Sequence, residues 1–190
     1  MLTTLVEGRP EATITLTQTT YLHLQVDDVA YRVDFLDKVE FRLKPGVRGV
    51  LAHHTRHPLL LDYSEPQATV YLTSRPQDPP ALLRDLHRAV DSASHHWREL
   101  PRYLFGWSTA NALASLEKNL TDGSGLVVER APASIVRAVV GACDQHGAAT
   151  YLWGTLEAPA PANPYSVLFI GSCYVVARNF QVRAVKKTGE

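Results

Sequence analysis

The sequence predicts an α+β fold in which an antiparallel β-meander from the N-terminal half packs against about three helices, with additional strands nearer the C-terminus. Two observations support this prediction. Through much of residues 12–76, apolar residues alternate with polar ones at the two-residue period of half-buried strands. Beyond residue 78, apolar residues recur at spacings of three and four, the period of an amphipathic helix. Strands that precede a mixture of helices and strands are typical of the α+β class.

Short strands separated by turns are predicted for the first part of the chain. Asp27-Asp28 and Pro45-Gly46 are turn signals, and the Pro-Gly pair suits a type II turn. Because the turns are short, neighbouring strands are expected to run antiparallel. The predicted strands span residues 12–17, 21–26, 30–36, 39–43, 58–63 and 68–73.

Helices are predicted for much of the second part. Pro79 suits the start of a helix, where proline costs least, and the residue before Pro101 suits its end. Ser108 is expected to cap a second helix, and Pro132 to open a third. The predicted helices span 79–100, 109–118 and 132–146, and the predicted strands 126–128, 150–156 and 167–176. The last of these is very apolar, so we expect a central strand buried on both faces.

The chain is predicted to form a single domain over residues 1–190. No flexible linker separates the halves near residue 77, and 190 residues are enough to bury a self-sufficient core. Within that domain the composition favours a β-rich part over 1–77, a mixed α/β part over 78–182 and a polar tail over 183–190.

Composition excludes several classes of function. Lys and Arg balance Asp and Glu, for a formal net charge of +0, so broad binding to nucleic acid is not expected. No apolar run approaches the ~20 residues of a membrane helix, and the N-terminus lacks the pattern of a signal peptide. We therefore expect a soluble, cytoplasmic protein. Cys143 and Cys173 lie in apolar runs and are expected to be buried free thiols.

The most informative stretch is a basic, histidine-rich segment over residues 41–61. It contains no acidic residue, yet cations and imidazoles gather in it. Such a stretch in a neutral chain is suited to an anion or a metal ion. The residues that we expect to contact an anionic ligand are Arg42, Arg48, His54, Arg56 and His57.

These residues favour a non-enzymatic binding or interaction module. Its expected partner is an acidic protein surface or a small phosphorylated ligand. The sequence contains no nucleophile elbow and no phosphate-binding loop, and no catalytic triad can be assembled from it. On this interpretation neither an enzymatic activity nor a cofactor is expected.

The alternative is a metal-dependent hydrolase that uses clustered histidines, with zinc as its metal. His87, Asp91 and His95 are spaced four apart, which places them on one side of the predicted helix 79–100. This row faces away from the apolar stripe, so it needs a covering element to form a site. The candidate metal ligands are His53, His54, His57, His87, Asp91 and His95, with Asp62 as a further candidate.

Overall fold

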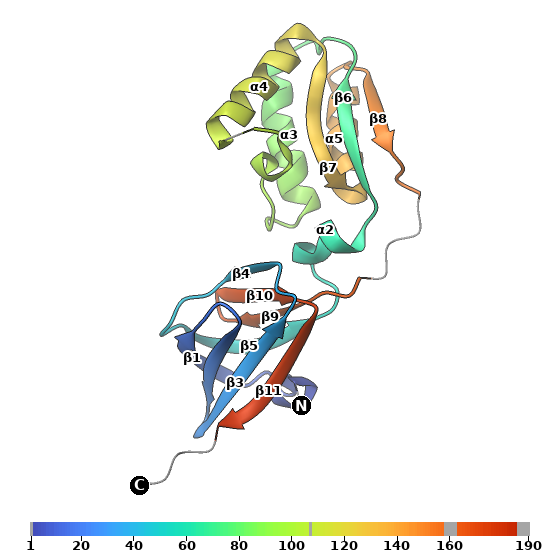
Figure 1. The fold of residues 1–190 in the computed structure, drawn as a ribbon. Helices are drawn as coiled ribbons and strands as arrows, with labels where there is room; N and C mark the ends of the chain where they lie inside the picture. Colours follow the sequence, from blue (N-terminus) through green and yellow to red (C-terminus); the bar gives the residue numbers. More distant parts are fainter. Residues whose placement is uncertain (1, 107, 158–162, 186–190) are drawn as a thin grey trace. The chain divides into compact units, whose positions relative to one another are not determined.

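The computed structural model describes residues 2–106, 108–157 and 163–185, and it shows an α+β fold (Figure 1). Its internal contacts divide the chain into two compact units. Unit 1 comprises residues 1–60 and 164–190, and unit 2 comprises residues 61–163. Unit 2 is thus inserted into the sequence of unit 1, and the boundary follows Leu60 rather than residue 77. The single domain expected from the sequence stays a prediction, because it depends on whether the two units unfold together in one cooperative step.

Unit 1 is built on an eight-stranded sheet with the order β11-β3-β2-β1-β5-β9-β10-β4. All of its neighbouring strands are antiparallel. The predicted meander is present as β1, β2 and β3 (Figure 1). Of the C-terminal strands, β11 forms one end of the sheet, and β9 and β10 lie between β5 and β4. The strands are β1 (Glu11–Thr17), β2 (Tyr21–Val26), β3 (Val29–Leu36), β4 (Glu40–Arg42), β5 (Arg48–His54), β9 (Ser166–Ile170), β10 (Cys173–Ala177) and β11 (Asn179–Val185).

One face of this sheet forms the core of unit 1. Alternate residues such as Ile14, Leu24, Val33 and Leu51 are fully buried and belong to one apolar cluster. The short helix α1 (Leu2–Val6) packs against the same cluster. The meander was predicted to pack against the helices of residues 79–146. In the structure its apolar face instead packs mostly against side chains of other strands of unit 1. Apolar residues of the C-terminal strands supply the side chains that the meander alone lacks.

Unit 2 packs helices against a three-stranded antiparallel sheet with the order β7-β6-β8. Figure 1 shows α3, α4 and α5 gathered beside this sheet. Their apolar faces and the strands share a second buried cluster, which includes Leu86 and Val139. The elements are α2 (Leu61–Ser64), β6 (Gln67–Leu72), α3 (Pro79–Ala93), α4 (Thr109–Asp122), β7 (Gly125–Pro132), α5 (Ala133–Gln145) and β8 (Thr150–Gly154). None of the described helices is long and apolar enough to cross a membrane.

Local sequence signals account for where these helices begin. The Asp78 side chain accepts a hydrogen bond of 2.9 Å from the Ala81 N–H and caps α3. Ser108 caps α4 in the same way, as predicted, through the Asn111 N–H at 3.3 Å. Gly123 ends α4 in the left-handed conformation that glycine adopts without steric cost.

Three sequence-based assignments were wrong. Residues 58–63, predicted as a strand, form a 3₁₀ turn over Pro58–Leu60 and then α2. Residues 167–176, predicted as one central strand, form a hairpin of β9 and β10 that turns at Gly171, whose φ is +56°. The helix predicted over 79–100 ends at Ala93, because Ser94 caps it and both His95 and His96 have positive φ.

The C-terminal residues differ from the prediction in part. Residues 183–185 of the predicted polar tail belong to β11, where Arg183 lies opposite Arg32 of β3. Residues 186–190 lie outside the described part of the chain. Cys143 and Cys173 are buried free thiols, as predicted.

Candidate functional site

The outer face of the unit 1 sheet brings part of the histidine-rich segment against aromatic side chains. Leu51 of β5 points into the core, so Ala52 shares the opposite face with His54, two residues further along. Cross-strand pairing continues this face from Ala52 to Phe169 of β9, then to Tyr174 of β10 and Arg42 of β4. The turn after β5 adds His57. We call Arg42, His54, His57, Phe169 and Tyr174 the imidazole–aromatic face.

Ring contacts hold this face together. The His57 ring centroid lies 4.8 Å from that of Phe169 and 5.7 Å from that of His54. His54 also meets Phe169 at 5.8 Å, and Phe169 meets Tyr174 at 6.0 Å. These separations lie in the range of favourable ring–ring contacts. Two imidazoles are therefore held at fixed positions on an aromatic platform.

Hydrogen bonds orient two members of the face. His57 Nδ1 accepts a hydrogen bond of 3.2 Å from the Leu59 N–H. In the neutral ring this acceptor role places the proton on Nε2. The Tyr174 hydroxyl donates to the Glu40 carboxylate at 2.8 Å. Both bonds limit the rotation of side chains that would otherwise sample several rotamers.

Cations lie within and beside the face. Arg42 and Arg56 are exposed, and neither forms an ion pair within the described residues. Arg48 lies on the same sheet face but six residues from His54 along β5, a separation of about 20 Å for a strand. Its guanidinium pairs with the Glu11 carboxylate at 2.5 Å, and both side chains are exposed. Of the predicted ligand-contacting residues, the structure brings Arg42, His54 and His57 to one face, and Arg48 lies at its far end.

His53 takes no part in this face. It lies beside the core, where its Nε2 is 2.8 Å from the Ser166 hydroxyl and its ring meets Phe180 edge-on at 5.9 Å. Burial lowers the pKa of His53 because the imidazolium loses hydration, and the neighbouring His54 adds to this. His53 is therefore a packing residue, which separates it from the His54 and His57 pair.

The helical row of His87, Asp91 and His95 does not form. Helix α3 ends before His95, whose φ of +51° turns the chain away from the helical path. The Asp91 carboxylate instead contacts His96 Nδ1 at 2.6 Å. His87 lies on α3 in unit 2, whereas the other histidine cluster belongs to unit 1. Among the described residues, no group of three or more His, Cys, Asp or Glu side chains is placed to hold a metal ion. The hydrolase alternative stays a prediction.

The Asp62 carboxylate, considered above as a metal ligand, binds polar side chains of unit 2 instead. Its carboxylate accepts hydrogen bonds from the Tyr103 hydroxyl at 2.9 Å and from Arg102 Nε at 2.8 Å. Arg98, which is 4% exposed, lies 3.4 Å away through its Nε. Burial, and next the Asp62 charge, raise the pKa of Tyr103, so this hydroxyl stays protonated as a donor. The cluster ties α2 to the 3₁₀ turn over Leu100–Tyr103 and serves the fold of unit 2.

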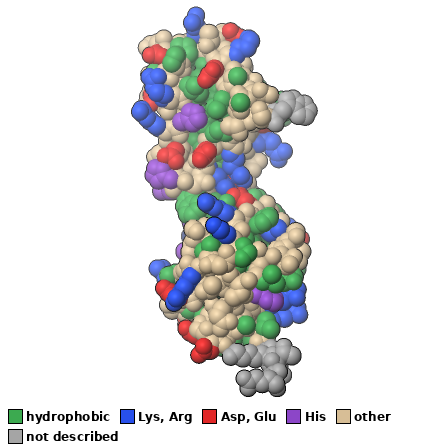
Figure 2. Space-filling model, turned by 90° about the vertical axis from the view of Figure 1, so that its left-hand side faces the viewer, with side chains coloured by type: hydrophobic (Ala, Val, Ile, Leu, Met, Phe, Trp, Pro, Cys, Tyr) green, Lys and Arg blue, Asp and Glu red, His purple; other side chains and the backbone are tan. Residues whose placement is uncertain are grey.

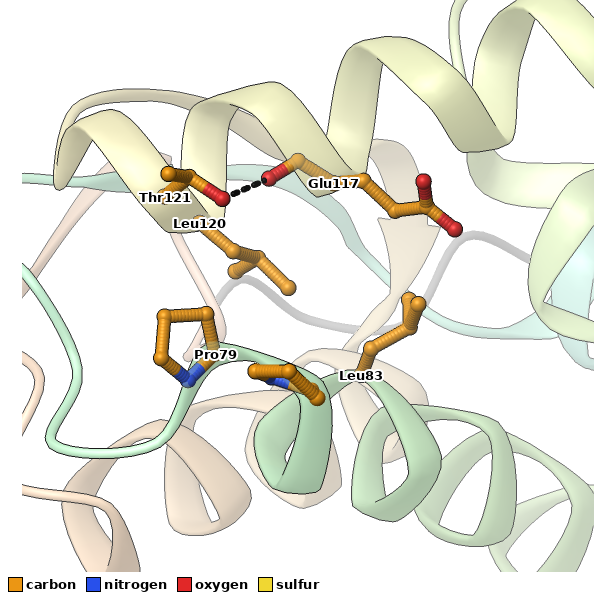
Figure 3. Close-up of a pocket in the computed structure, with 6 residues that line it drawn as sticks. Pro79, Leu83, Glu117, Leu120 and Thr121 are labelled. Atoms are coloured by element: carbon orange, nitrogen blue, oxygen red, sulfur yellow. Dashed lines mark hydrogen bonds between the residues drawn. The ribbon is translucent and has the colours of Figure 1, made fainter.

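The cavity drawn in Figure 3 is lined mainly by apolar side chains and carries no convergent set of polar groups. It has a volume of about 220 Å³ and lies between the start of α3 and the end of α4. Leu120 extends from α4 toward Pro79 and Leu83. The Thr121 hydroxyl donates to the Glu117 carbonyl within the same helix at 2.9 Å, so its hydrogen is not offered to a ligand in the cavity. This cavity is a packing gap between two helices.

Charge is mixed on the surface. On the face shown in Figure 2, basic and acidic side chains are interspersed over each unit. Comparison of the chain with family models, with curated proteins and with solved structures finds no match.

Sequence reasoning missed Phe169 and Tyr174. Both lie in the stretch that was predicted as one strand buried on both faces, where outward-facing side chains were not expected. Gly171 was the available signal, because an isolated glycine in an apolar run marks a bulge or a turn. A hairpin there exposes alternate residues of each strand on the outer face.

Proposed function

We propose that this protein is a non-enzymatic binding module whose imidazole–aromatic face recognises an acidic segment of a partner protein. The observation that carries the proposal is the meeting of the His54 and His57 rings with Phe169, at 5.8 and 4.8 Å, next to the exposed Arg42. Imidazoles and a guanidinium donate hydrogen bonds to carboxylates, and guanidinium does so with two parallel bonds.

The shape of this surface favours an extended segment over a small molecule. The face follows a cross-strand row from β5 to β4 on the outside of a sheet, which offers successive contacts along a line. A peptide that crosses this row meets aromatic rings in the middle and a cation at the β4 end. A small phosphorylated ligand offers a similar charge but needs enclosure to be held by many donors at once.

The test uses a fluorescent oligoglutamate peptide and measures its anisotropy on titration with the full-length protein. The double variant Arg42→Glu/Arg56→Glu should weaken binding at least about tenfold, because two attractions become repulsions. The matched control is Arg9→Glu/Arg183→Glu, which makes the same change of charge at exposed positions of unit 1 that are not members of the face.

The control should bind the peptide nearly as the unmodified protein does. Equal loss in both double variants would show that net charge alone attracts the peptide, and would contradict the proposed face. Competition by inorganic phosphate at low concentration would point instead to a phosphorylated ligand.

A further inference from the structure

Strand β8 leaves one edge of the unit 2 sheet open. In the sheet order β7-β6-β8, no described strand lies beyond β8. The exposed edge carries the sequence Thr-Tyr-Leu-Trp-Gly, without a charge or a proline. Natural edge strands usually carry charged residues or proline, which prevent pairing with other chains. Two large aromatic side chains are exposed on it, Tyr151 at 57% and Trp153 at 66%.

The register fixes which backbone groups face outward. The Thr73 N–H donates to the Ala149 carbonyl at 2.9 Å, and Leu72 lies opposite Thr150. Hydrogen-bonded and non-hydrogen-bonded pairs alternate along an antiparallel ladder. The backbone groups of Tyr151 and Trp153 therefore point toward β6. Those of Thr150, Leu152 and Gly154 point outward, and no described residue outside the strand bonds to them.

We propose that β8 pairs with β8 of a second copy of this chain, antiparallel and about a two-fold axis at Leu152. In this register Leu152 exchanges two backbone hydrogen bonds with its own counterpart. Thr150 and Gly154 pair with each other across the axis in the same way. The two-fold axis therefore pairs the outward-facing backbone groups of Thr150, Leu152 and Gly154 with those of the second copy. The two three-stranded sheets join into one continuous sheet.

The side chains are self-complementary in the same register. Tyr151 lies opposite Trp153 of the second copy at a non-hydrogen-bonded pair, where side chains approach most closely. Tyr71 already lies beside Tyr151 within one chain, at 6.4 Å between ring centroids. A row of aromatic rings therefore continues across the axis. Glu157, the one acidic residue of 147–157, lies opposite Gly147, so no like charges meet.

The test measures the mass of the full-length protein by sedimentation equilibrium over a dilution series. We expect a reversible dimer of the 21.0 kDa chain. The double variant Tyr151→Lys/Trp153→Lys places like charges opposite each other twice in this register. It should weaken self-association at least about tenfold, equivalent to ~1.4 kcal/mol.

The matched control is Tyr151→Lys/Trp153→Glu, which loses the same aromatic rings but places opposite charges across the axis. It should remain dimeric, with far-ultraviolet circular dichroism showing that both variants are folded. A monomeric unmodified protein would overturn the proposal. So would equal behaviour of the two double variants, because the proposed register places like charges opposite each other in the first and unlike charges in the second.

Discussion

Single residues in this protein divide between those that hold the fold and those that we propose to contact a partner. Asp62 belongs to the first group although a carboxylate among histidines and arginines suggests a site. Its carboxylate is committed to Tyr103 and Arg102, with Arg98 close by. The imidazole–aromatic face belongs to the second group, because its rings lie on the outside of a sheet.

Asp62→Ala should lower the free energy of unfolding by about 3–5 kcal/mol, because it leaves the buried Arg98 without this countercharge. Urea denaturation measures the loss. Asp122→Ala is the matched control, since it removes an exposed carboxylate whose partner is Lys118 on the same helix, and it should cost about 0.5 kcal/mol or less. Similar losses in the two variants would contradict the structural role of Asp62.

His53 should make stability depend on pH. Its pKa in the folded protein lies below the ordinary 6.5, so the unfolded chain binds more protons between the two values. The stabilisation by neutral His53 is complete above pH 6.5 and is lost as the pH falls through the lowered pKa. Urea denaturation at several pH values should show a flatter profile for His53→Gln than for the unmodified protein. An unchanged slope would show that His53 is not the group responsible.

In unit 1, β5 passes very close to the turn between β9 and β10. A Cβ atom added to Gly49 would lie 2.4 Å from the Gly171 Cα, which is backbone and has little room to move. The hairpin therefore needs a residue without a side chain at this crossing. The same crossing positions Phe169 beside β5, and Tyr174 lies opposite Phe169 on the next strand.

Gly49→Ala should destabilise the protein by about 1–3 kcal/mol through this overlap. Gly141→Ala is the control, because nothing lies within 4 Å of the added atom and alanine is the better helix former. The control should leave the melting temperature unchanged or raise it. A stable Gly49→Ala protein would contradict the close approach of the two segments.

Helices and strands that carry local sequence signals were predicted better than the elements against which they pack or pair. Strand β2 and the start of α4 followed from alternation and from a capping serine. The end of α3 did not, because the apolar spacing continues to Trp97 while the backbone turns at His95. Phe169 joined the candidate site only through the register of β9 with β5, which pairs residues more than a hundred positions apart. Period and composition do not encode such a pairing.

At the scale of the whole molecule, the chain contains two apolar cores that belong to different units. Unit 2 is continuous in sequence, and its sheet and helices share one of these cores. Unit 1 is discontinuous, since its sheet needs both ends of the chain. Unit 1 carries an excess of Lys and Arg, and unit 2 an excess of Asp and Glu.

A fragment of residues 61–163 should therefore fold without the rest of the chain. Thermal unfolding followed by circular dichroism should show a cooperative transition for the fragment. The full-length protein should then unfold in more than one step. A fragment without a transition, beside a full-length protein that unfolds in one step, would support the single domain that the sequence predicts.

The central claim is that the imidazole–aromatic face binds an acidic segment, and nuclear magnetic resonance tests it most directly. The full-length ¹⁵N-labelled protein is titrated with oligoglutamate, and backbone amide shifts are followed. The account predicts that the largest shifts fall on Arg42, His54, His57 and Phe169, with little change in unit 2. Shifts confined to unit 2, or no shifts at peptide excess, would contradict it.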